Sequence, residues 1–282
     1  MKIIDVSVHQ GKIDWKKVKA AGIGGVIIRA GYGKGNIDGR FKENIEGAIK
    51  AGFKTIGVYW FSYAYDTEMA KREAQFCNDV IKPYKDKINL GVYFDWEYDS
   101  MNYAKKNGVY PNKNLITNMN LYFCERIKEL GYKAGYYLNL DYQKNYIDVS
   151  RLKAFYKWFA RYTSEKQKDC YLWQYSSSGK VTGISGNVDM NELIGKPVDH
   201  NNDSSGNKNN AGNTEDYDMP TIKRGKSGKA VKIWQVIIGT TVDGIFGTNT
   251  EAKTKTFQEK HNLKVDGIVG PKTWKAGLGS VK

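Results

Sequence analysis

The sequence predicts an α/β fold, an irregular (β/α) barrel followed by a small all-helical domain. In the first two-thirds of the chain, apolar strand-like runs alternate with helix-like segments of about ten or more residues, the pattern of βαβ units. The runs are apolar throughout, which is typical of parallel strands buried on both faces. Near residue 196 the composition changes to Asn, Asp, Ser and Gly, and a short repeat follows.

The barrel elements are expected in a regular order. Expected helices end where glycine, a common C-terminal cap residue, follows an amphipathic run. The late strands lose their intervening helices, so we expect an irregular barrel. Expected strands cover residues 3–8, 24–33, 54–64, 89–97, 133–139, 157–163 and 170–176, and expected helices cover residues 14–22, 40–52, 67–84 and 114–131.

The second part of the chain is expected to be a separate domain. We assign residues 1–198 to the barrel, 199–219 to a flexible polar linker and 220–282 to the helical module. Within the module, VDGIFGTNT at 242–250 is repeated as VDGIVGPKT at 265–273. Amphipathic segments lie before and between the two copies, which indicates three short helices with DG turns.

Charge and cysteine content narrow the function classes. The chain has 44 Lys and Arg against 30 Asp and Glu, a net charge of +14. These residues are scattered, which favours a diffuse attraction to polyanions over a base-reading nucleic-acid site. Cys77, Cys124 and Cys170 are widely spaced, so we expect neither a disulfide framework nor a zinc site.

Export and membrane signals are missing from the sequence. Its first residues have no secretory h-region, and no apolar run reaches transmembrane length. We therefore expect synthesis in the cytoplasm and no membrane insertion. If the protein acts outside the cell, another agent must release it.

Two acids in the stretch GVYFDWEYDS point to chemistry. Alternate residues of a strand face the same way, so Asp95 and Glu97 share a face and lie roughly 6.6 Å apart along it. Repulsion and apolar neighbours should separate their pKa values, leaving one protonated and the other anionic, as glycoside hydrolysis requires. The alternative is a solvated or salt-bridged pair of acids at a strand end.

Further acids are expected at the same end of the barrel. Asp5 lies near the end of the first strand, and Asp189 follows the last strand. Four converging carboxylates with His9 would allow a divalent metal, but no second His or HExxH-like spacing supports one. We therefore expect no metal and no cofactor, with His9 as a scaffold residue.

Aromatic residues make up 13% of the chain, and several lie toward the expected strand ends. Aromatic faces stack on sugar rings, although ordinary barrel packing explains such residues equally well. The candidates for contact with a sugar are Tyr59, Phe61, Tyr137, Trp173 and Tyr175.

At this point the chain resembles a known family. The motifs DVSVHQGKIDW, IIRAGYG, GVYWFSY, DWE, GYY, WFARY, LWQY and GNVDMN occur in order over roughly residues 1–195. Together they resemble glycoside hydrolase family 25, the Chalaropsis-type lysozymes of phage endolysins and bacterial autolysins. Residues 221–282 resemble the three-helix peptidoglycan-binding module.

The resemblance implies an N-acetylmuramidase that cleaves the β-1,4 bond between N-acetylmuramic acid and N-acetylglucosamine. It implies Glu97 as general acid, Asp95 as the orienting and stabilising carboxylate, and Asp5 and Asp189 as acids that shape the site. By the same resemblance, the residues that match substrate-groove positions are Arg29, Tyr59, Tyr137, Arg161, Trp173 and Gln174.

The implied partners are the peptidoglycan of a Gram-positive wall and its anionic polymers. The motifs leave open a covalent intermediate or assistance by the substrate's acetamido group; we favour assistance. Alternatives are a non-catalytic, lectin-like wall-binding protein, hydrolysis of chitin or another N-acetylhexosamine polymer, and, from charge alone, a nucleic-acid-binding protein. Phage or bacterial origin, target species and oligomeric state stay open.

Overall fold

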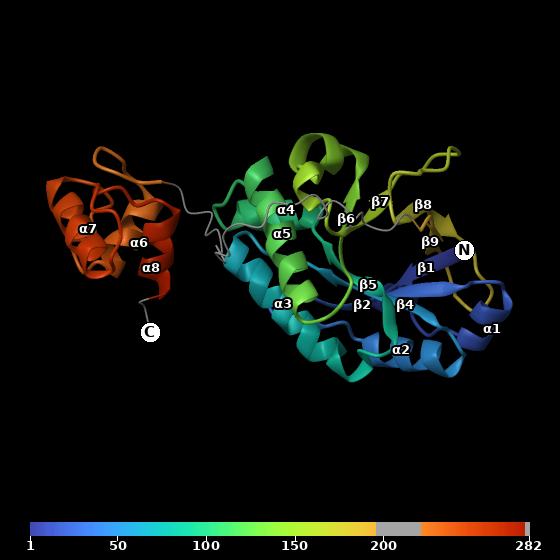
Figure 1. Cartoon of the computed structure of the whole chain (residues 1–282). Coiled ribbons are helices and arrows are strands. Elements are labelled where there is room, and N and C mark those ends of the chain that lie inside the picture. Colours follow the sequence, from blue (N-terminus) through green and yellow to red (C-terminus); the bar gives the residue numbers. More distant parts are fainter. Residues whose placement is uncertain (196–220, 280–282) are drawn as a thin grey trace, which may run out of the picture. The chain divides into compact units, whose positions relative to one another are not determined.

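The computed structural model describes residues 1–195 and 221–279 (Figure 1). The chain divides into two compact units, one within Met1–Ser205 and one within Gly206–Lys282. The domain boundaries expected from the sequence, 198/199 and 219/220, fall in residues 196–220, outside the described residues. Those boundaries therefore stay a prediction.

Eight strands of the first unit close into a barrel, in which β1 pairs with β2 to complete the ring. All run parallel except β9, which lies antiparallel between β8 and β1. The irregular (β/α) barrel is confirmed. The strands are β1 (Lys2–Val6), β2 (Gly25–Tyr32), β4 (Thr55–Phe61), β5 (Ile88–Asp95), β6 (Ala134–Asn139), β7 (Tyr156–Ala160), β8 (Leu172–Gly179) and β9 (Val188–Leu193), and β3 (Asn36–Ile37) pairs with β2.

Helices cover the outside of the barrel (Figure 1). Four were expected: α1 (Trp15–Ala20), α2 (Phe41–Lys50), α3 (Thr67–Ile81) and α5 (Lys113–Glu129). A fifth, α4 (Tyr98–Lys106), was not expected, because its sequence is mostly polar and lacks a long apolar stripe. The short helical turns are η1 (Val8–Gln10), η2 (Lys82–Tyr84), η3 (Tyr142–Tyr146) and η4 (Val149–Leu152).

The barrel has two apolar layers, one on the outer face of its strands and one on the inner face. The larger layer lies between the strands and the helices. The smaller layer fills the barrel and consists of Ile3, Ile27, Tyr59, Leu90, Tyr93, Tyr137, Trp158, Ala160 and Leu172. Because strand residues alternate between faces, the residue two positions further along each strand also points inward. This places polar side chains directly above the apolar plug, at the carboxyl ends of the strands.

The last barrel strand differs from the sequence prediction. We expected Asp189 to follow the final strand, but it lies within β9 and pairs directly with Asp5 of β1. The prediction was wrong because β9 carries polar residues on its inner face and lacks the apolar run of a buried parallel strand. Its antiparallel direction brings its first residues to the carboxyl ends of the other strands.

The second unit is a small helical module, as expected. Its helices are α6 (Lys229–Ile237), α7 (Thr248–Lys260) and α8 (Pro271–Gly279). Val231, Trp234, Phe246, Val269 and Trp274 form its buried core. No helix in the described parts of either unit combines the length and apolar character needed to cross a bilayer.

Candidate active site

Asp95 and Glu97 form a hydrogen-bonded pair of carboxyl groups at the end of β5. The strand ends at Asp95, and Glu97 precedes the first turn of α4. The backbone of Glu97 is still extended, with φ −126° and ψ −164°, so the alternation of faces continues past the strand. Trp96 points the other way, buried in the outer layer, and its indole N–H donates to the Ala64 carbonyl at 2.8 Å.

Burial raises the pKa of both carboxyls. For Asp95, which is 5% exposed, repulsion by Glu97 adds to desolvation and holds the pKa well above its usual range. Burial also raises the pKa of the half-buried Glu97. The hydrogen bond between them raises the pKa of Asp95 and lowers that of Glu97, so the two carboxyls are held in unequal environments.

Asp5 and Asp189 form a second coupled pair, directly across the β1–β9 ladder. Burial and then the charge of Asp189 raise the pKa of Asp5 well above its usual range, and burial raises the pKa of Asp189. The two pairs interact: the charge of Asp5 raises the pKa of Asp95, and that of Asp189 raises the pKa of Glu97. The structure therefore brings together the four acids predicted from sequence.

A buried amide network holds Asp5. Its Oδ2 accepts from Gln174 Nε2 at 3.0 Å and from Asn191 Nδ2 at 2.7 Å. Trp158 Nε1 donates to Asn191 Oδ1 at 2.7 Å. The hydroxyl of Tyr137 donates to Gln174 Oε1 at 3.0 Å. Both amides are thus oriented with their N–H groups toward the acid.

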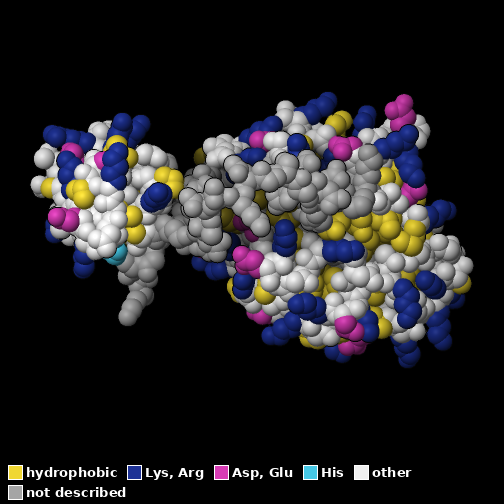
Figure 2. Space-filling model, in the orientation of Figure 1, with side chains coloured by type: hydrophobic (Ala, Val, Ile, Leu, Met, Phe, Trp, Pro, Cys, Tyr) yellow, Lys and Arg dark blue, Asp and Glu magenta, His cyan; other side chains and the backbone are white. Residues whose placement is uncertain are grey.

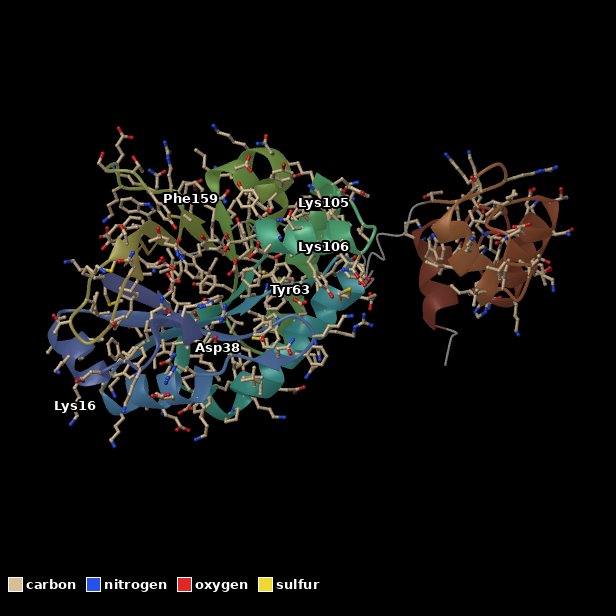
Figure 3. The ribbon with its side chains drawn as sticks, turned by 180° about the vertical axis from the view of Figure 1, so that it is seen from behind. Lys16, Asp38, Tyr63, Lys105, Lys106 and Phe159 are labelled. Carbon is tan, nitrogen blue, oxygen red and sulfur yellow. The ribbon has the colours of Figure 1, made fainter. Side chains whose placement is uncertain are left out.

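Arg29 supplies positive charge beside the acids. Its Nε donates to Asp38 Oδ2 at 2.7 Å, and Asp38, labelled in Figure 3, also accepts backbone N–H groups from Val8 and Arg40. The guanidinium lowers the pKa of Asp95, although this effect is smaller than desolvation and repulsion. A fixed cation near this carboxyl favours its anionic form.

The remaining predicted residues divide into two groups. Tyr59 and Tyr137 face the inside of the barrel and pack edge-on against Trp158, and Phe61 lies beside Asp95 in the β4–β5 register. Trp173 points outward into the layer under the helices, since its neighbour Gln174 points inward. Arg161 is exposed and donates to Gln167 Oε1 at 3.1 Å. The structure thus does not bring Trp173 or Arg161 to the acids.

Sequence reasoning missed Asn191, Trp158 and Asp38. Asn191 lies two residues after Asp189, so the alternation of a strand would have placed it on the same face. Asp38 lies in a loop, where no periodicity gives its direction. Among the described residues, no group of three or more His, Cys, Asp and Glu side chains is arranged to hold a metal ion.

A closed, mostly parallel barrel with interacting, protonatable carboxyls at its strand ends has the fold and the chemistry of a glycoside hydrolase. Comparison with known proteins specifies the family. Residues 4–184 match glycosyl hydrolases family 25, and residues 234–276 match a putative peptidoglycan binding domain. The chain belongs to glycosyl hydrolase family 25, as the sequence motifs predicted.

Individual relatives agree with this assignment. An autolytic lysozyme of Clostridium acetobutylicum is 29% identical over 335 aligned positions, covering 97% of this chain and 98% of that protein. The modular autolysin LytC of Streptococcus pneumoniae is 30% identical with a TM-score of 0.58; the match covers 67% of this chain but 46% of LytC. A Bacillus anthracis family 25 structure, 23% identical, shares the fold with a TM-score of 0.58, covering 70% of this chain and 89% of that one.

The expected enzyme class is confirmed: the chain is a glycosidase of the lysozyme class that hydrolyses peptidoglycan. Its catalytic barrel is combined with a peptidoglycan-binding module. The role of each acid and the finer choice of substrate are treated below as proposals.

Proposed function

We propose that the barrel cleaves the β-1,4 bond between N-acetylmuramic acid and N-acetylglucosamine, with Glu97 as general acid. The observation that carries the proposal is the hydrogen-bonded Asp95–Glu97 pair, which holds a proton at the strand ends. Hydrolysis of a glycoside needs both a proton for the leaving oxygen and negative charge near the anomeric carbon. One shared proton between two carboxyls supplies both.

The pair must place its proton on Glu97 before it can be donated. In this proposal the proton of the free protein lies on Asp95, the more buried acid, whereas the half-buried Glu97 has access to a ligand. When the glycosidic oxygen accepts a hydrogen bond from Glu97, the proton passes from Asp95 to Glu97 along the existing bond. Asp95 becomes anionic as Glu97 protonates the leaving group, and its charge then stabilises the developing oxocarbenium ion.

The substrate's own acetamido group completes the displacement in this proposal. Its oxygen attacks the anomeric carbon as the bond to the leaving oxygen breaks, and the resulting ring is opened by water with retention of configuration. The negative charge of Asp95 orients the acetamido N–H. Asp5 and Asp189 shape and polarise the same region.

The products test which bond is cut. We expect mass spectrometry of purified Gram-positive wall digested by the full-length enzyme to show new reducing ends on N-acetylmuramic acid. Reducing N-acetylglucosamine ends would instead show a glucosaminidase. If chitin oligomers were cut as fast as wall, the enzyme would accept a wider range of substrates than we propose.

A non-catalytic, lectin-like wall binder is the competing function. A pure binder has no use for a protonatable pair with raised pKa values. Wild type and Glu97→Gln should bind purified wall equally while only wild type releases soluble fragments. Equal release by both proteins would remove Glu97 from the mechanism.

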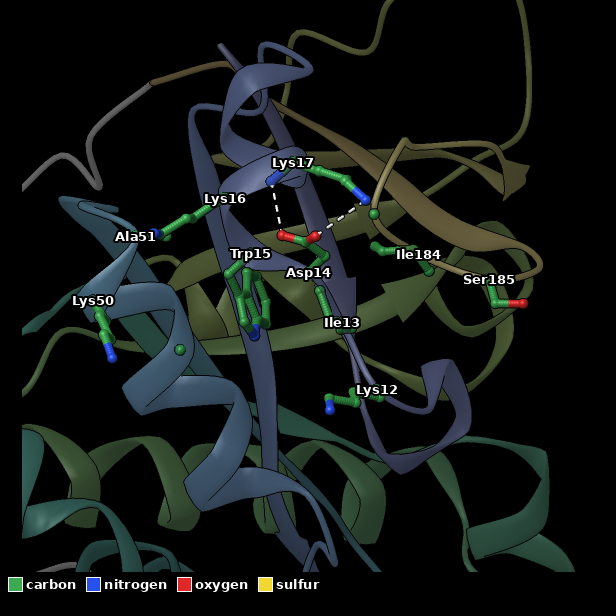
Figure 4. A pocket seen from close by; sticks show the side chains of 12 residues that line it. Lys12, Ile13, Asp14, Trp15, Lys16, Lys17, Lys50, Ala51, Ile184 and Ser185 are labelled. Carbon is green, nitrogen blue, oxygen red and sulfur yellow. Dashed lines mark hydrogen bonds and ion pairs between the residues drawn. The ribbon is translucent and has the colours of Figure 1, made fainter.

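Anionic wall polymers are proposed as a second contact. Lys and Arg side chains are spread over the face seen in Figure 2, and one concave site concentrates them. A cavity of about 760 Å³ lies among α1, the end of α2 and the β8–β9 loop, and none of the four acids lines it (Figure 4). Four lysines line it: Lys12, Lys16, Lys17 and Lys50.

The charge of this cavity is mostly uncompensated. Asp14 is the only acid that lines it, and it forms an ion pair with Lys17 at 3.4 Å. Lys12, Lys16 and Lys50 have no ion pair within the described residues, so they are available to polymer phosphates. Such contacts weaken as salt screens them.

Removal of these lysines tests the contact. The triple variant Lys12→Gln/Lys16→Gln/Lys50→Gln should dissociate from wall that bears teichoic acid at a lower salt concentration than wild type. On wall stripped of teichoic acid, the two proteins should dissociate at the same salt concentration. A triple variant at three exposed lysines outside the cavity that also have no ion pair within the described residues, Lys105, Lys128 and Lys153, is the charge-matched control. Equal release by both variants would show that charge acts diffusely.

We also propose that the enzyme acts on the cell wall outside the cytoplasm in which it is made. This rests on its substrate, since peptidoglycan lies beyond the membrane, and on its wall-binding module. Fractionation of producing cells, with wall-bound enzyme scored before and after lysis, tests the proposal. Wall binding that precedes lysis would require a dedicated export route.

A further inference from the structure

Glu73 on α3 is a buried carboxyl outside the acid cluster. Its residue is 1% exposed, and its Oε1 accepts the backbone N–H of Tyr63 at 3.1 Å. Its Oε2 is buried without a hydrogen-bond partner among the described residues. A carboxylate in such a place carries a high desolvation cost, so a structural role alone would be served better by glutamine.

The turn that Glu73 holds, Ser62–Ala64, supports the acid pair. Ser62 N–H donates to the Asp95 carbonyl at 2.7 Å, and the Ser100 hydroxyl donates to the Ser62 carbonyl at 2.6 Å. The same Ser100 oxygen accepts the backbone N–H of Glu97 at 3.1 Å. With the bond from Trp96 to Ala64, the turn is tied to both acids and to the residue between them.

We propose that Glu73 is a positioning residue for the Asp95–Glu97 pair: its neutral carboxyl fixes the Ser62–Ala64 turn, and ionisation loosens the turn because it places an unpaired charge on the buried Oε2. The inference rests on the assignment of these two acids as the reacting pair. Figure 3 shows Tyr63, the residue that Glu73 contacts, among the side chains of this region.

The surroundings of Glu73 keep it neutral at pH 7. Burial raises its pKa to about 8, and the hydrogen bonds from the Ser62 side chain and the Tyr63 backbone oppose this only in part. The titratable groups beside it are Cys77 on α3 and Tyr63 on the turn, whose pKa values burial raises further. No charge on a described residue of β4, β5 or α5 contributes to its pKa. As the pH rises, Glu73 is therefore the first of these three groups to lose its proton.

The pH dependence of wall digestion is the first test. Glu73→Gln keeps a neutral acceptor, so we expect activity within about twofold of wild type at pH 7 and an alkaline limb displaced upward by about one pH unit. Glu73→Met removes the acceptor for Tyr63 N–H and should lower kcat about tenfold. Glu68→Gln, an exposed position on the same helix, is the matched control. An alkaline limb unchanged in Glu73→Gln would overturn the proposal.

A spectroscopic test separates Glu73 from the acid pair. In full-length Glu97→Gln, the indole N–H signal of Trp96 should titrate with a midpoint of about 8, and this step should vanish in Glu73→Gln/Glu97→Gln. A flat signal in the single variant, or a step that persists in the double variant, would refute the positioning role. If Glu97→Gln retained turnover, the acid assignment would fail, and the indole titration would still decide whether Glu73 controls the turn.

Discussion

Trp158 orients the Asn191 amide that donates to Oδ2 of Asp5. An indole N–H can only donate, so Asn191 must turn its oxygen toward Trp158 and its amide N–H toward Asp5. Gln174 adds a second N–H to the same Asp5 oxygen. These two bonds lower the pKa of Asp5, against the larger effect of burial.

Asn191→Leu tests this arrangement. It leaves the Trp158 N–H without an acceptor and removes one donor from Asp5, so we expect a loss of about 1–3 kcal/mol in unfolding free energy. The pKa of Asp5 should rise further, and wall digestion should slow. Denaturant unfolding and digestion rates are the measurements, with Asn114→Leu on the exposed face of α5 as the control. Unchanged stability would show that the buried network is energetically neutral.

Glu73 should make stability fall as pH rises. Its pKa is 4.5 when unfolded and about 8 when folded, so between these values the folded state holds a proton that the unfolded state has lost. Stability from this group is therefore complete below pH 4.5 and declines toward pH 8, by at most about 1.4 kcal/mol per unit. The melting temperature of Glu73→Gln relative to wild type should increase over this window. A constant difference would show that Glu73 titrates normally.

At the scale of elements, the parallel strands and their helices could be predicted because each is a long, regular pattern. The end of β5 could not, because nothing in the sequence shows that α4 begins directly after Glu97. The face shared by Asp95 and Glu97 was still predicted correctly, since the backbone stays extended through that junction. Trp173 and Gln174 are adjacent in one strand, and their sequence alone does not show which of the two points into the barrel. In the structure, only Gln174 reaches the acids.

The repeat in the helical module is also a repeat of hydrogen bonds. Gln235 Nε2 donates to Asp243 at 2.7 Å and its Oε1 accepts Gly244 N–H at 2.8 Å. Gln258 makes the same contacts with Asp266 at 3.0 Å and Gly267 at 2.9 Å. Each buried glutamine thus closes the DG turn that follows its own helix.

Because the two networks match, Gln235→Ala and Gln258→Ala should destabilise the module to a similar extent, by about 2–4 kcal/mol. Hydrogen exchange of the α6 and α7 amides in the full-length chain is the measurement. Thr256→Ala, at an exposed position of α7, should have little effect. Unequal losses would show that one turn carries more of the module's stability.

At the scale of the whole molecule, the barrel should not need the module to fold or to cut. A fragment of residues 1–198 is predicted to be soluble and active on dissolved glycan strands, because the barrel closes on itself and has its own core. On insoluble wall it should be retained less, since tethering raises the local concentration of the catalyst. Co-sedimentation with wall measures this. An insoluble fragment would place the boundary elsewhere.

The central claim is that the Asp95–Glu97 pair delivers one proton to the leaving sugar. The most direct test is the rate at which Glu97→Gln digests purified peptidoglycan at the optimum pH of the wild type. We predict a loss of about 10²–10⁴-fold, the usual contribution of a general acid, with a melting temperature no lower than wild type because a partly desolvated carboxyl is removed. A folded Glu97→Gln enzyme with wild-type turnover would contradict the account.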